Sequence, residues 1–449
     1  MIKKTTLFSI FFLLFSITIY AQSKFNFFGQ DQKEVSIRFK LINNLIVLPI
    51  NVNGKPLSFI LDTGVDKTIL FNLSQNDSIG LNNVKKISLQ GLGGGDPLEA
   101  LLSKGNNMKL KTFVSNSEDI YVILKDKFDV SSKMGVTIHG IIGHKIFKDA
   151  IVYINYAYNK IVLYNPKYYK QKKCRKCETF PLQFYRNKPY INAKVRLDTI
   201  NNRYTDVKLL IDSGGSEAIW LFENTKEEIK TPIKHFNDIL GEGLSGTIYG
   251  NRSRLKGIKL GRFHIKNPTV SFLDSTSTFY ARQFKARNGS IGGNILKRFK
   301  VWVDYPNKRI TLKKNGSFKG GFEYNMSGLD VVYNGKTLVK ELVPVKFKDA
   351  FSDGNSNTLK NNTISVVSNY RFTFKPSYRV KHVLKGSPGD KAGIMANDVI
   401  VSINGVRVHE YTLKEVLSKF QTGHHKRVKM KIERNGVPMK FEFKLVKKI

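Results

Sequence analysis

Residues Phe59-Ile60-Leu61-Asp62-Thr63-Gly64 indicate the fold, because the same pattern returns later in the chain as Leu209-Leu210-Ile211-Asp212-Ser213-Gly214. Each copy is an apolar run that ends in Asp, a hydroxyl residue and Gly. The two aspartates are 150 residues apart (212 − 62 = 150). A repeat of this length predicts two domains of the same fold within one chain.

A second element repeats downstream of each aspartate. Gly140-Ile141-Ile142-Gly143 aligns at the same offset with Ser290-Ile291-Gly292-Gly293, so the spacing from Asp to Gly is 81 in both copies (143 − 62 and 293 − 212). Each copy then closes with a strand, a turn and another strand. We therefore predict two homologous lobes, residues 30–168 and 178–316, joined by a Lys- and Tyr-rich segment.

The fold class follows from the pattern between residues 35 and 316, where short Val-, Ile- and Phe-rich runs alternate with Gly, Asn and Asp turn signals. This pattern predicts mainly β structure, in two similar β lobes. The chain has 449 residues and 41% hydrophobic residues, which suffices for several buried cores without disulfides.

The aspartates carry the candidate chemistry. One Asp-Thr-Gly or Asp-Ser-Gly is a weak signal, since such tripeptides also form turns and helix caps. Two carboxylates held about a hydrogen bond apart cannot both ionise cheaply, so they share one proton. The ionised member can activate a water, while the protonated member binds a peptide carbonyl oxygen. We predict Asp62 and Asp212 as catalytic residues, with no metal or cofactor.

Four neighbouring residues are candidates for supporting the carboxylates. Gly64 and Gly214 let the backbone pass close behind the carboxylates and offer N–H groups to them. The hydroxyls of Thr63 and Ser213 can hydrogen-bond across to the opposite lobe. Replacing either hydroxyl residue is therefore expected to loosen the junction between the lobes.

Residues 35–314 resemble the pepsin-like and retropepsin-like aspartic peptidases, whose lobes each pair such an Asp turn with a later apolar-apolar-Gly segment. The resemblance implies a bilobal β fold, a cleft, an extended peptide or protein substrate and an active monomer. Val65 and Gly215 stand where the family usually has Ser or Thr, and Gly292 stands where an apolar residue is usual.

The family also closes its cleft with a Gly-rich hairpin. Gly93 and Gly94 in the first lobe, and Gly243 and Leu244 in the second, occupy the matching places. They are candidates for contact with substrate, and the alternative is that they serve only as hairpin tips.

Residues 322–449 form a third region, which begins after a Gly-rich break. Residues 386–394 and 397–405 resemble bacterial PDZ domains, which implies an α+β fold with a polar loop inserted around 345–369. PDZ domains add a peptide to a sheet edge and hold its terminal carboxylate. The candidate peptide-binding loop and edge strand are Gly328, Leu329, Asp330 and Val331. The alternative is a domain that only packs against the peptidase.

The first 21 residues read as an export signal, with Lys3 and Lys4 followed by an apolar run over residues 7–19. An uncleaved anchor is the alternative, but the run is shorter than the roughly 20 residues of a spanning helix. We expect a mature chain without a transmembrane segment, in the periplasm, in the cell envelope or outside the cell. An oxidising compartment would permit a local disulfide between Cys174 and Cys177.

The net charge is +39 (74 − 35), which favours anionic surfaces. The lysines are dispersed and no nucleic-acid-binding motif accompanies them, so we expect no specific nucleic-acid partner. The leading hypothesis is an exported aspartic endopeptidase whose PDZ domain captures peptides, including protein C-termini. The rivals are a catalytically inactive peptide-binding scaffold of the cell envelope and a basic protein that binds anionic polymers.

Overall fold

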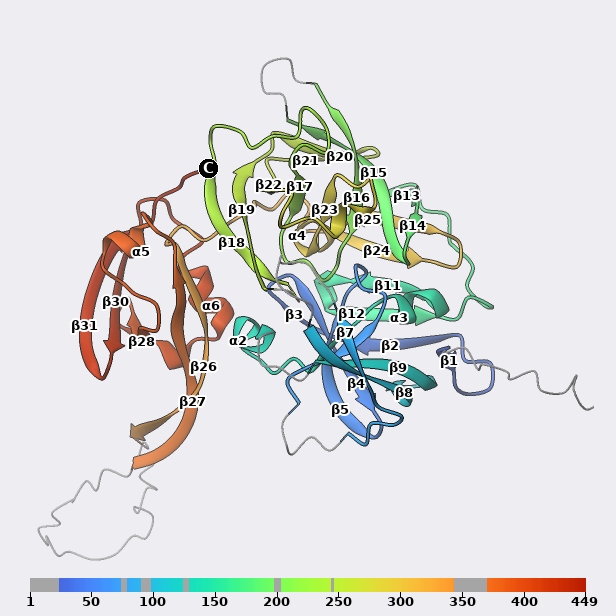
Figure 1. The fold of residues 1–449 in the computed structure, drawn as a ribbon, viewed down its shortest axis with the longest axis horizontal. Coiled ribbons are helices and arrows are strands. Elements are labelled where there is room, and N and C mark those ends of the chain that lie inside the picture. The colour runs from blue at the N-terminus through green and yellow to red at the C-terminus, as the bar shows by residue number, and fades with distance from the viewer. Residues whose placement is uncertain are drawn as a thin grey trace, which may run out of the picture. The chain divides into compact units, whose positions relative to one another are not determined.

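The computed structural model describes residues 24–73, 79–89, 98–123, 129–197, 203–243, 246–342 and 370–449. The predicted signal peptide and the predicted polar loop at 345–369 lie outside these residues. The chain divides into two compact units (Figure 1). The first takes the chain up to Asp129 and from Thr137 to Phe322, and the second takes Val130–Val136 and Glu323–Ile449.

A nine-stranded sheet forms the first lobe of the first unit. In sheet order its strands are β1 (Asn26–Phe27), β9 (Phe113–Ile123), β6 (Thr68–Leu70), β10 (Gly140–Ile142), β5 (Lys55–Leu61), β4 (Leu45–Val52), β8 (Leu98–Leu110) and β7 (Lys85–Leu89), with β3 (Lys40–Ile42) beside β4. The apolar run before Asp62 is thus β5, a strand in the middle of the sheet.

A ten-stranded sheet forms the second lobe. Its strands, in order, are β18 (Phe236–Gly243), β19 (Gly246–Arg254), β22 (Thr269–Leu273), β17 (Ile219–Phe222), β23 (Gly289–Ile291), β16 (Thr205–Ile211), β15 (Lys188–Arg196), β20 (Gly257–Leu260) and β21 (Phe263–Lys266), with β14 (Gln183–Tyr185) beside β15. The order β17-β23-β16-β15 repeats the order β6-β10-β5-β4 of the first lobe, so the predicted duplication of the fold is confirmed.

The register of the second repeat differs from the sequence alignment by one residue. In the first lobe Gly140 pairs with Phe59 in parallel strands, and in the second lobe Gly289 pairs with Leu209. Gly143 therefore corresponds to Gly292 and not to Gly293, and the Asp-to-Gly spacing is 81 in one lobe and 80 in the other (143 − 62 and 292 − 212). The prediction of 81 in both copies was wrong, because backbone pairing sets the register.

Steric crowding supports this correction. A β-carbon on Gly143 would lie 1.9 Å from the carbonyl oxygen of Asp62, and one on Gly292 would lie 2.3 Å from the carbonyl oxygen of Glu217. Each of these glycines directly precedes a short helix, α3 (His144–Asp149) or α4 (Gly293–Leu296). Ser290, rather than Gly292, therefore occupies the position of the first apolar residue of the motif.

A third sheet joins the two lobes. Its six strands, in order, are β13 (Cys177–Pro181), β25 (Arg309–Lys314), β24 (Phe299–Asp304), β11 (Ile151–Asn155), β12 (Lys160–Tyr164) and β2 (Glu34–Arg38). The lobes meet where β11 pairs with β24, with Val152 opposite Val303. Apolar side chains of both lobes form one continuous core cluster. The two aspartate turns are therefore held by shared packing as well as by their own contacts.

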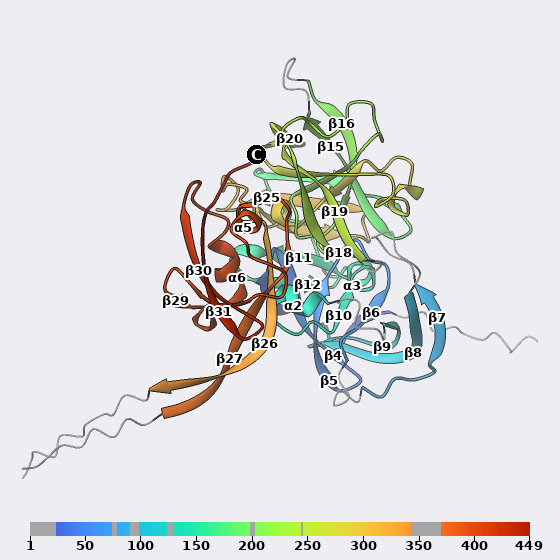
Figure 2. The same ribbon diagram turned by 60° about the vertical axis from the view of Figure 1, so that its left-hand side comes forward.

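The second unit contains a six-stranded sheet (Figure 2). Its strands are β26 (Leu329–Leu342), β27 (Tyr370–Val383), β28 (Val399–Ile403), β30 (Arg427–Arg434) and β31 (Val437–Lys444), with β29 (Val406–Arg407) beside β28. Its helices are α2 (Val130–Met134), α5 (Pro388–Lys391) and α6 (Leu413–Ser418). Helix α6 begins at Leu413 because the preceding residue, Thr412, forms a reciprocal capping box with Glu415. Helix α2 comes from the segment that the sequence assigned to the first lobe.

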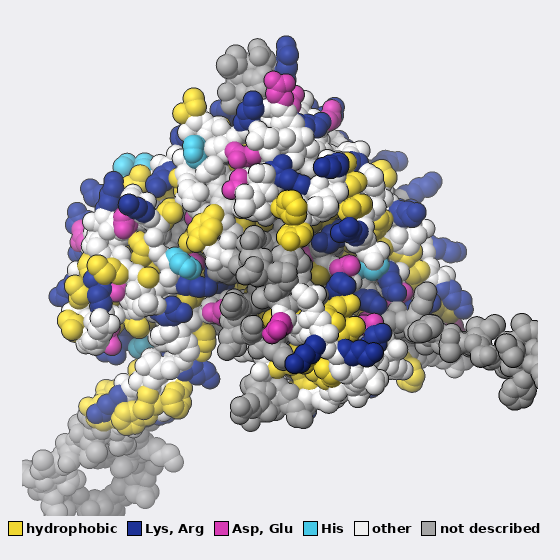
Figure 3. Space-filling view, viewed as in Figure 1, with side chains coloured by type: hydrophobic (Ala, Val, Ile, Leu, Met, Phe, Trp, Pro, Cys, Tyr) yellow, Lys and Arg dark blue, Asp and Glu magenta, His cyan; other side chains and the backbone are white. Residues whose placement is uncertain are grey.

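The described surface is basic over much of the face shown in Figure 3, where Lys and Arg side chains are dispersed rather than gathered. The distal parts of β26 and β27 expose five large apolar side chains. These are Leu338, Leu342, Tyr370, Phe372 and Phe374. Within the residues that the structure describes, no helix has the length and apolar character needed to cross a membrane.

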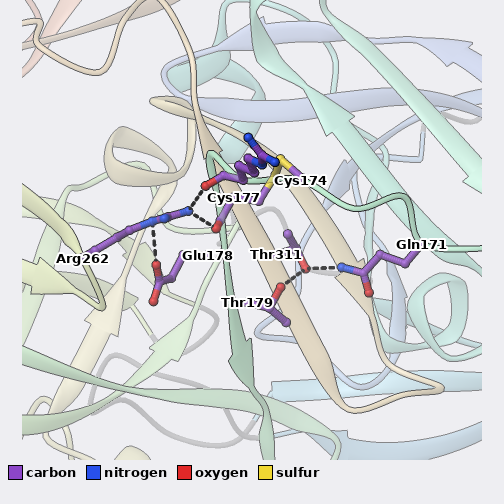
Figure 4. The surroundings of a disulfide bond; sticks show 8 residues. Gln171, Cys174, Cys177, Glu178, Thr179, Arg262 and Thr311 are labelled. Atoms are coloured by element: carbon purple, nitrogen blue, oxygen red, sulfur yellow. Dashed lines mark hydrogen bonds and ion pairs between the residues drawn. A yellow bond between two sulfur atoms is a disulfide. The ribbon is translucent and has the colours of Figure 1, made fainter.

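The two cysteines lie between the lobes, just before and at the start of β13. Cys174 and Cys177 form a disulfide (Figure 4). The guanidinium of Arg262 donates to the carbonyl oxygens of Arg175 and Cys177, and it pairs with Glu178 at 2.9 Å. These contacts fasten the connecting segment to the second lobe.

Candidate active site

The two Asp turns begin in the same way in both lobes. The backbone N–H of Asp62 donates to the carbonyl oxygen of Ile142 at 2.8 Å, and that of Asp212 donates to Ile291 at 2.9 Å. Each aspartate therefore leaves its strand at the point where the neighbouring parallel strand, β10 or β23, ends. This geometry directs both turns toward the junction of the lobes.

Four hydrogen bonds tie the turns together. The Thr63 hydroxyl donates to the carbonyl oxygen of Ile211 at 2.6 Å, and the Ser213 hydroxyl donates to that of Leu61 at 2.8 Å. The backbone N–H of each hydroxyl residue donates to the hydroxyl of the other, both at 3.0 Å. Thr63 and Ser213 are only 1% and 2% exposed, so water does not compete for these bonds.

The carboxyl groups of Asp62 and Asp212 hydrogen-bond each other. The N–H of Gly64 donates to Asp62 Oδ1 at 2.6 Å, and the N–H of Gly215 bonds the carboxyl group of Asp212. Both aspartates remain partly exposed. The pair thus combines a fixed geometry with access for a small molecule such as water.

Both carboxyl groups resist ionisation. Burial raises the pKa of Asp62 to about 7, and the negative charge of Asp212 adds to the rise. Burial also raises the pKa of Asp212, but the positive charges of Arg287 and Lys188 oppose that rise. The pair therefore retains one proton well above the pH at which an isolated carboxyl group loses its own, and Asp212 is favoured as the ionised member.

The two cations beside the pair were missed by sequence reasoning. Arg287 is 4% exposed, its Nε donates to the carbonyl oxygen of Gly289 at 3.2 Å, and its guanidinium lies 4.9 Å from the ring centre of Phe222. Lys188 begins β15 after a tight turn in which Arg186 and Asn187 both have positive φ. Arg287 lies two residues before β23, and this strand brings it near Asp212. No spacing in the sequence predicts that Lys188 or Arg287 lies beside the aspartate pair.

The predicted flap residues lie partly outside the described chain. In the first lobe β7 and β8 pair up to Leu89 and Leu98, and Gly93 and Gly94 fall in the interval that the structure does not describe. In the second lobe β18 and β19 form a hairpin that ends with the pair Gly243 and Gly246, and Leu244 falls outside. Both Gly-rich segments therefore connect paired antiparallel strands.

The predicted peptide-binding residues of the PDZ region lie at the start of its edge strand. Gly328 has a φ of 77°, and a β-carbon there would lie 2.1 Å from Cβ of Ser387. Leu329 and Val331 point into the core, being 0% and 2% exposed. Asp330 pairs with Lys133 at 3.5 Å and lies 3.1 Å from His382. No cluster of three or more His, Cys, Asp or Glu that could hold a metal occurs among the described residues.

The duplicated lobes and their facing Asp-Thr-Gly and Asp-Ser-Gly turns are the arrangement of a two-lobed aspartic peptidase. Comparisons agree with this class. Residues 48–146 and 198–296 each match the family model described as aspartyl protease, and residues 379–434 match the PDZ domain model. The chain therefore contains two domains that match the aspartyl protease family and a C-terminal region that matches the PDZ domain family.

Comparison with solved structures includes the crystal structure of aspartic proteinase from Irpex lacteus. The sequence of that proteinase is 13% identical to this one. The alignment covers 64% of this chain and 99% of the proteinase chain, with a TM-score of 0.43. No curated protein matches the sequence.

Replacing Thr63 with Val should destabilise the protein, because the carbonyl of Ile211 and the N–H of Ser213 would each lose a partner. Two unsatisfied buried groups cost about 2–5 kcal/mol together. Thermal unfolding measures the effect. Thr68→Val is the matched control, since Thr68 is 0% exposed and its hydroxyl has no hydrogen-bond partner among the residues that the structure describes. Equal destabilisation by the two variants would contradict the role of Thr63.

The two glycines of the Asp turns should differ in their tolerance of a side chain. A β-carbon on Gly214 would lie 2.2 Å from Cγ of Asp62, whereas one on Gly64 would lie 3.1 Å from the nearest carboxylate oxygen. Gly214→Ala should displace Asp62 by about 1 Å and lower kcat/KM on a peptide substrate by about 100-fold. Gly64→Ala should lower kcat/KM by a smaller factor. The reverse order would show that the turns do not hold the carboxyl groups as described.

Proposed function

We propose that this protein is an endopeptidase that hydrolyses peptide bonds with a water activated by Asp62 and Asp212. The observation that carries the proposal is the shared hydrogen bond between two carboxyl groups whose pKa values are both raised. General acid–base catalysis near neutral pH needs one protonated and one ionised group at the same centre. This pair meets that requirement with groups from a single chain, so we propose that the monomer is active.

In the proposed reaction the ionised Asp212 takes a proton from the water as its oxygen attacks the peptide carbonyl carbon. Asp62 donates its proton to the carbonyl oxygen, which becomes a hydroxyl of the tetrahedral intermediate. When the C–N bond breaks, the nitrogen gains a proton from Asp212 and leaves as an amine. The hydroxyl proton returns to Asp62, so the pair regains its starting state. Arg287 and Lys188 stabilise the charge of Asp212 in this cycle.

We further propose that the substrate is an extended peptide lying between the lobes, beneath the two Gly-rich hairpins, and that the PDZ domain captures peptide segments. Export to the periplasm, cell envelope or cell exterior is part of the proposal. It is supported by the basic and apolar start of the sequence and by the Cys174–Cys177 disulfide, which fits an oxidising compartment.

The direct test is cleavage of a denatured mixed protein substrate by the purified full chain across acidic to neutral pH. Asp62→Asn and Asp212→Asn should each abolish cleavage, because neither Asn can supply the shared proton. The same cleavage in the wild type and both variants, or none in the wild type, would reject the catalytic proposal and favour a peptide-binding scaffold.

Activity should fall as pH rises through about 7, where the pair loses its shared proton and Asp62 no longer acts as the acid. Lys188 lowers the pKa of both aspartates, since a positive charge favours ionisation. Lys188→Met should therefore move the alkaline limb of the kcat/KM profile to higher pH. Lys194→Met is the matched control, because Lys194 is an exposed residue of the same strand. A limb that moves to lower pH, or stays in place, would contradict the assignment.

A further inference from the structure

The PDZ sheet has an open edge at β26. Among the described strands β26 pairs only with β27, so its other side has no strand neighbour. Helix α6 contacts β26 on the same domain. PDZ domains take up peptides at an exposed sheet edge. We refer to the space between β26 and α6 as the PDZ groove.

A segment of the chain already lies against this groove. Helix α2 contacts β26, and Figures 1 and 2 both show α2 beside β26 and α6. On the strand side, Lys133 Nζ lies 3.5 Å from Asp330 Oδ2. On the helix side, the backbone of Gly135 approaches so closely that a β-carbon there would lie 3.0 Å from Cβ of Leu413. Residues 130–136 therefore span the groove from one wall to the other.

The side chains that line the PDZ groove are buried, as expected if a segment of the chain fills it. Met134, the last residue of α2, is 4% exposed. Leu413 at the start of α6 is 5% exposed, and Val416 one turn later is 0% exposed. A groove open to solvent would leave the first turn of its helix wall accessible. Gly135 lies directly against Leu413 and is one of the residues that cover it.

The loop before β26 is poorly suited to a free C-terminus. The N–H of Ser327 donates to the side-chain oxygen of Asn325 at 2.9 Å, and the N–H of Leu329 donates to the hydroxyl of Ser327 at 3.1 Å. These backbone donors would otherwise be available to a terminal carboxylate. A peptide segment from the interior of a chain brings no such carboxylate and needs no such donors.

We propose that the PDZ groove of this protein is filled by its own residues Val130–Val136, and that it accepts an internal segment bearing a Lys before an apolar residue rather than a free C-terminus. The recognition contacts are the ion pair of Lys133 with Asp330, the burial of Met134 and the close fit of Gly135 against Leu413. This inference refines the peptide capture proposed above and does not depend on catalysis.

The segment that fills the groove is also connected to the active site, because the chain continues from it into β10. Four residues after Val136 the chain enters β10, and directly before this strand the N–H of His139 donates to the carbonyl oxygen of Ser58 at 2.8 Å. Strand β10 then supports the backbone N–H of Asp62 through Ile142. A peptide that displaces residues 130–136 therefore acts on the chain close to the strand that positions one of the carboxyl groups.

Binding of a fluorescent peptide tests the proposal. The probe spans residues 129–137 with an amidated C-terminus, and the protein is the full chain with Asp62→Asn, which prevents cleavage. A tethered segment has an effective concentration of about 1 mM, so the free copy should compete poorly. Adding Lys133→Glu places a carboxylate beside Asp330 and weakens the tethered segment. The fraction of molecules whose PDZ groove is empty then increases, so we expect the apparent Kd of the probe to fall about tenfold.

Lys160→Glu is the matched control, because it makes the same charge change at an exposed position of β12 and should leave the Kd unchanged. The same probe with a free C-terminal carboxylate should bind within about twofold of the amidated form. Equal affinity of the parent and Lys133→Glu, binding to neither, or a strict need for the free carboxylate would each overturn the proposal. None of these results depends on whether the protein cleaves peptides, so the two proposals fail separately.

Hydrogen exchange provides a readout that needs no added peptide. In the parent protein the amides of residues 131–136 should be protected, because the segment is docked. Lys133→Glu should speed their exchange about tenfold while the amides of β30 stay protected, which would also show that the domain remains folded. Unchanged exchange of residues 131–136 would overturn the proposal.

Discussion

The hydrogen bonds between Thr63 and Ser213 are the constraint on which the rest of the catalytic unit depends. They link the two lobes where the two Asp turns meet. Because each hydroxyl binds the backbone of the opposite lobe, the carboxyl groups of Asp62 and Asp212 are held in one geometry. The shared proton, the raised pKa values and the proposed acid–base roles all follow from this closeness.

The sequence predicted the duplicated β lobes, the aspartate pair and the PDZ region, because a repeated apolar strand with Asp-hydroxyl-Gly leaves few alternatives. It misplaced the second Gly motif by one residue, since Ser290 interrupts the apolar pattern and only strand pairing fixes the register. It also missed Lys188 and Arg287. Their importance comes from three-dimensional proximity to Asp212, which neither spacing nor residue type reveals.

The assignment of residues 130–136 to the PDZ unit was equally hidden. In sequence these residues lie inside the first lobe, between β9 and β10, so a linear division of domains gives them to the peptidase. Their contacts with Asp330 and Leu413 place them with the C-terminal unit instead. Through this segment the chain runs directly from the PDZ groove, where we propose peptide binding, to the strand beside Asp62.

In the proposed mechanism Asp62 and Asp212 jointly hold one proton. Carbon-13 NMR titration of the side-chain carboxyl groups of Asp62 and Asp212 in the intact protein tests it most directly. We expect one of the two groups still to titrate near pH 7 and this step to disappear when Asp62 is replaced by Asn. Independent titration of both groups near pH 4 would contradict it.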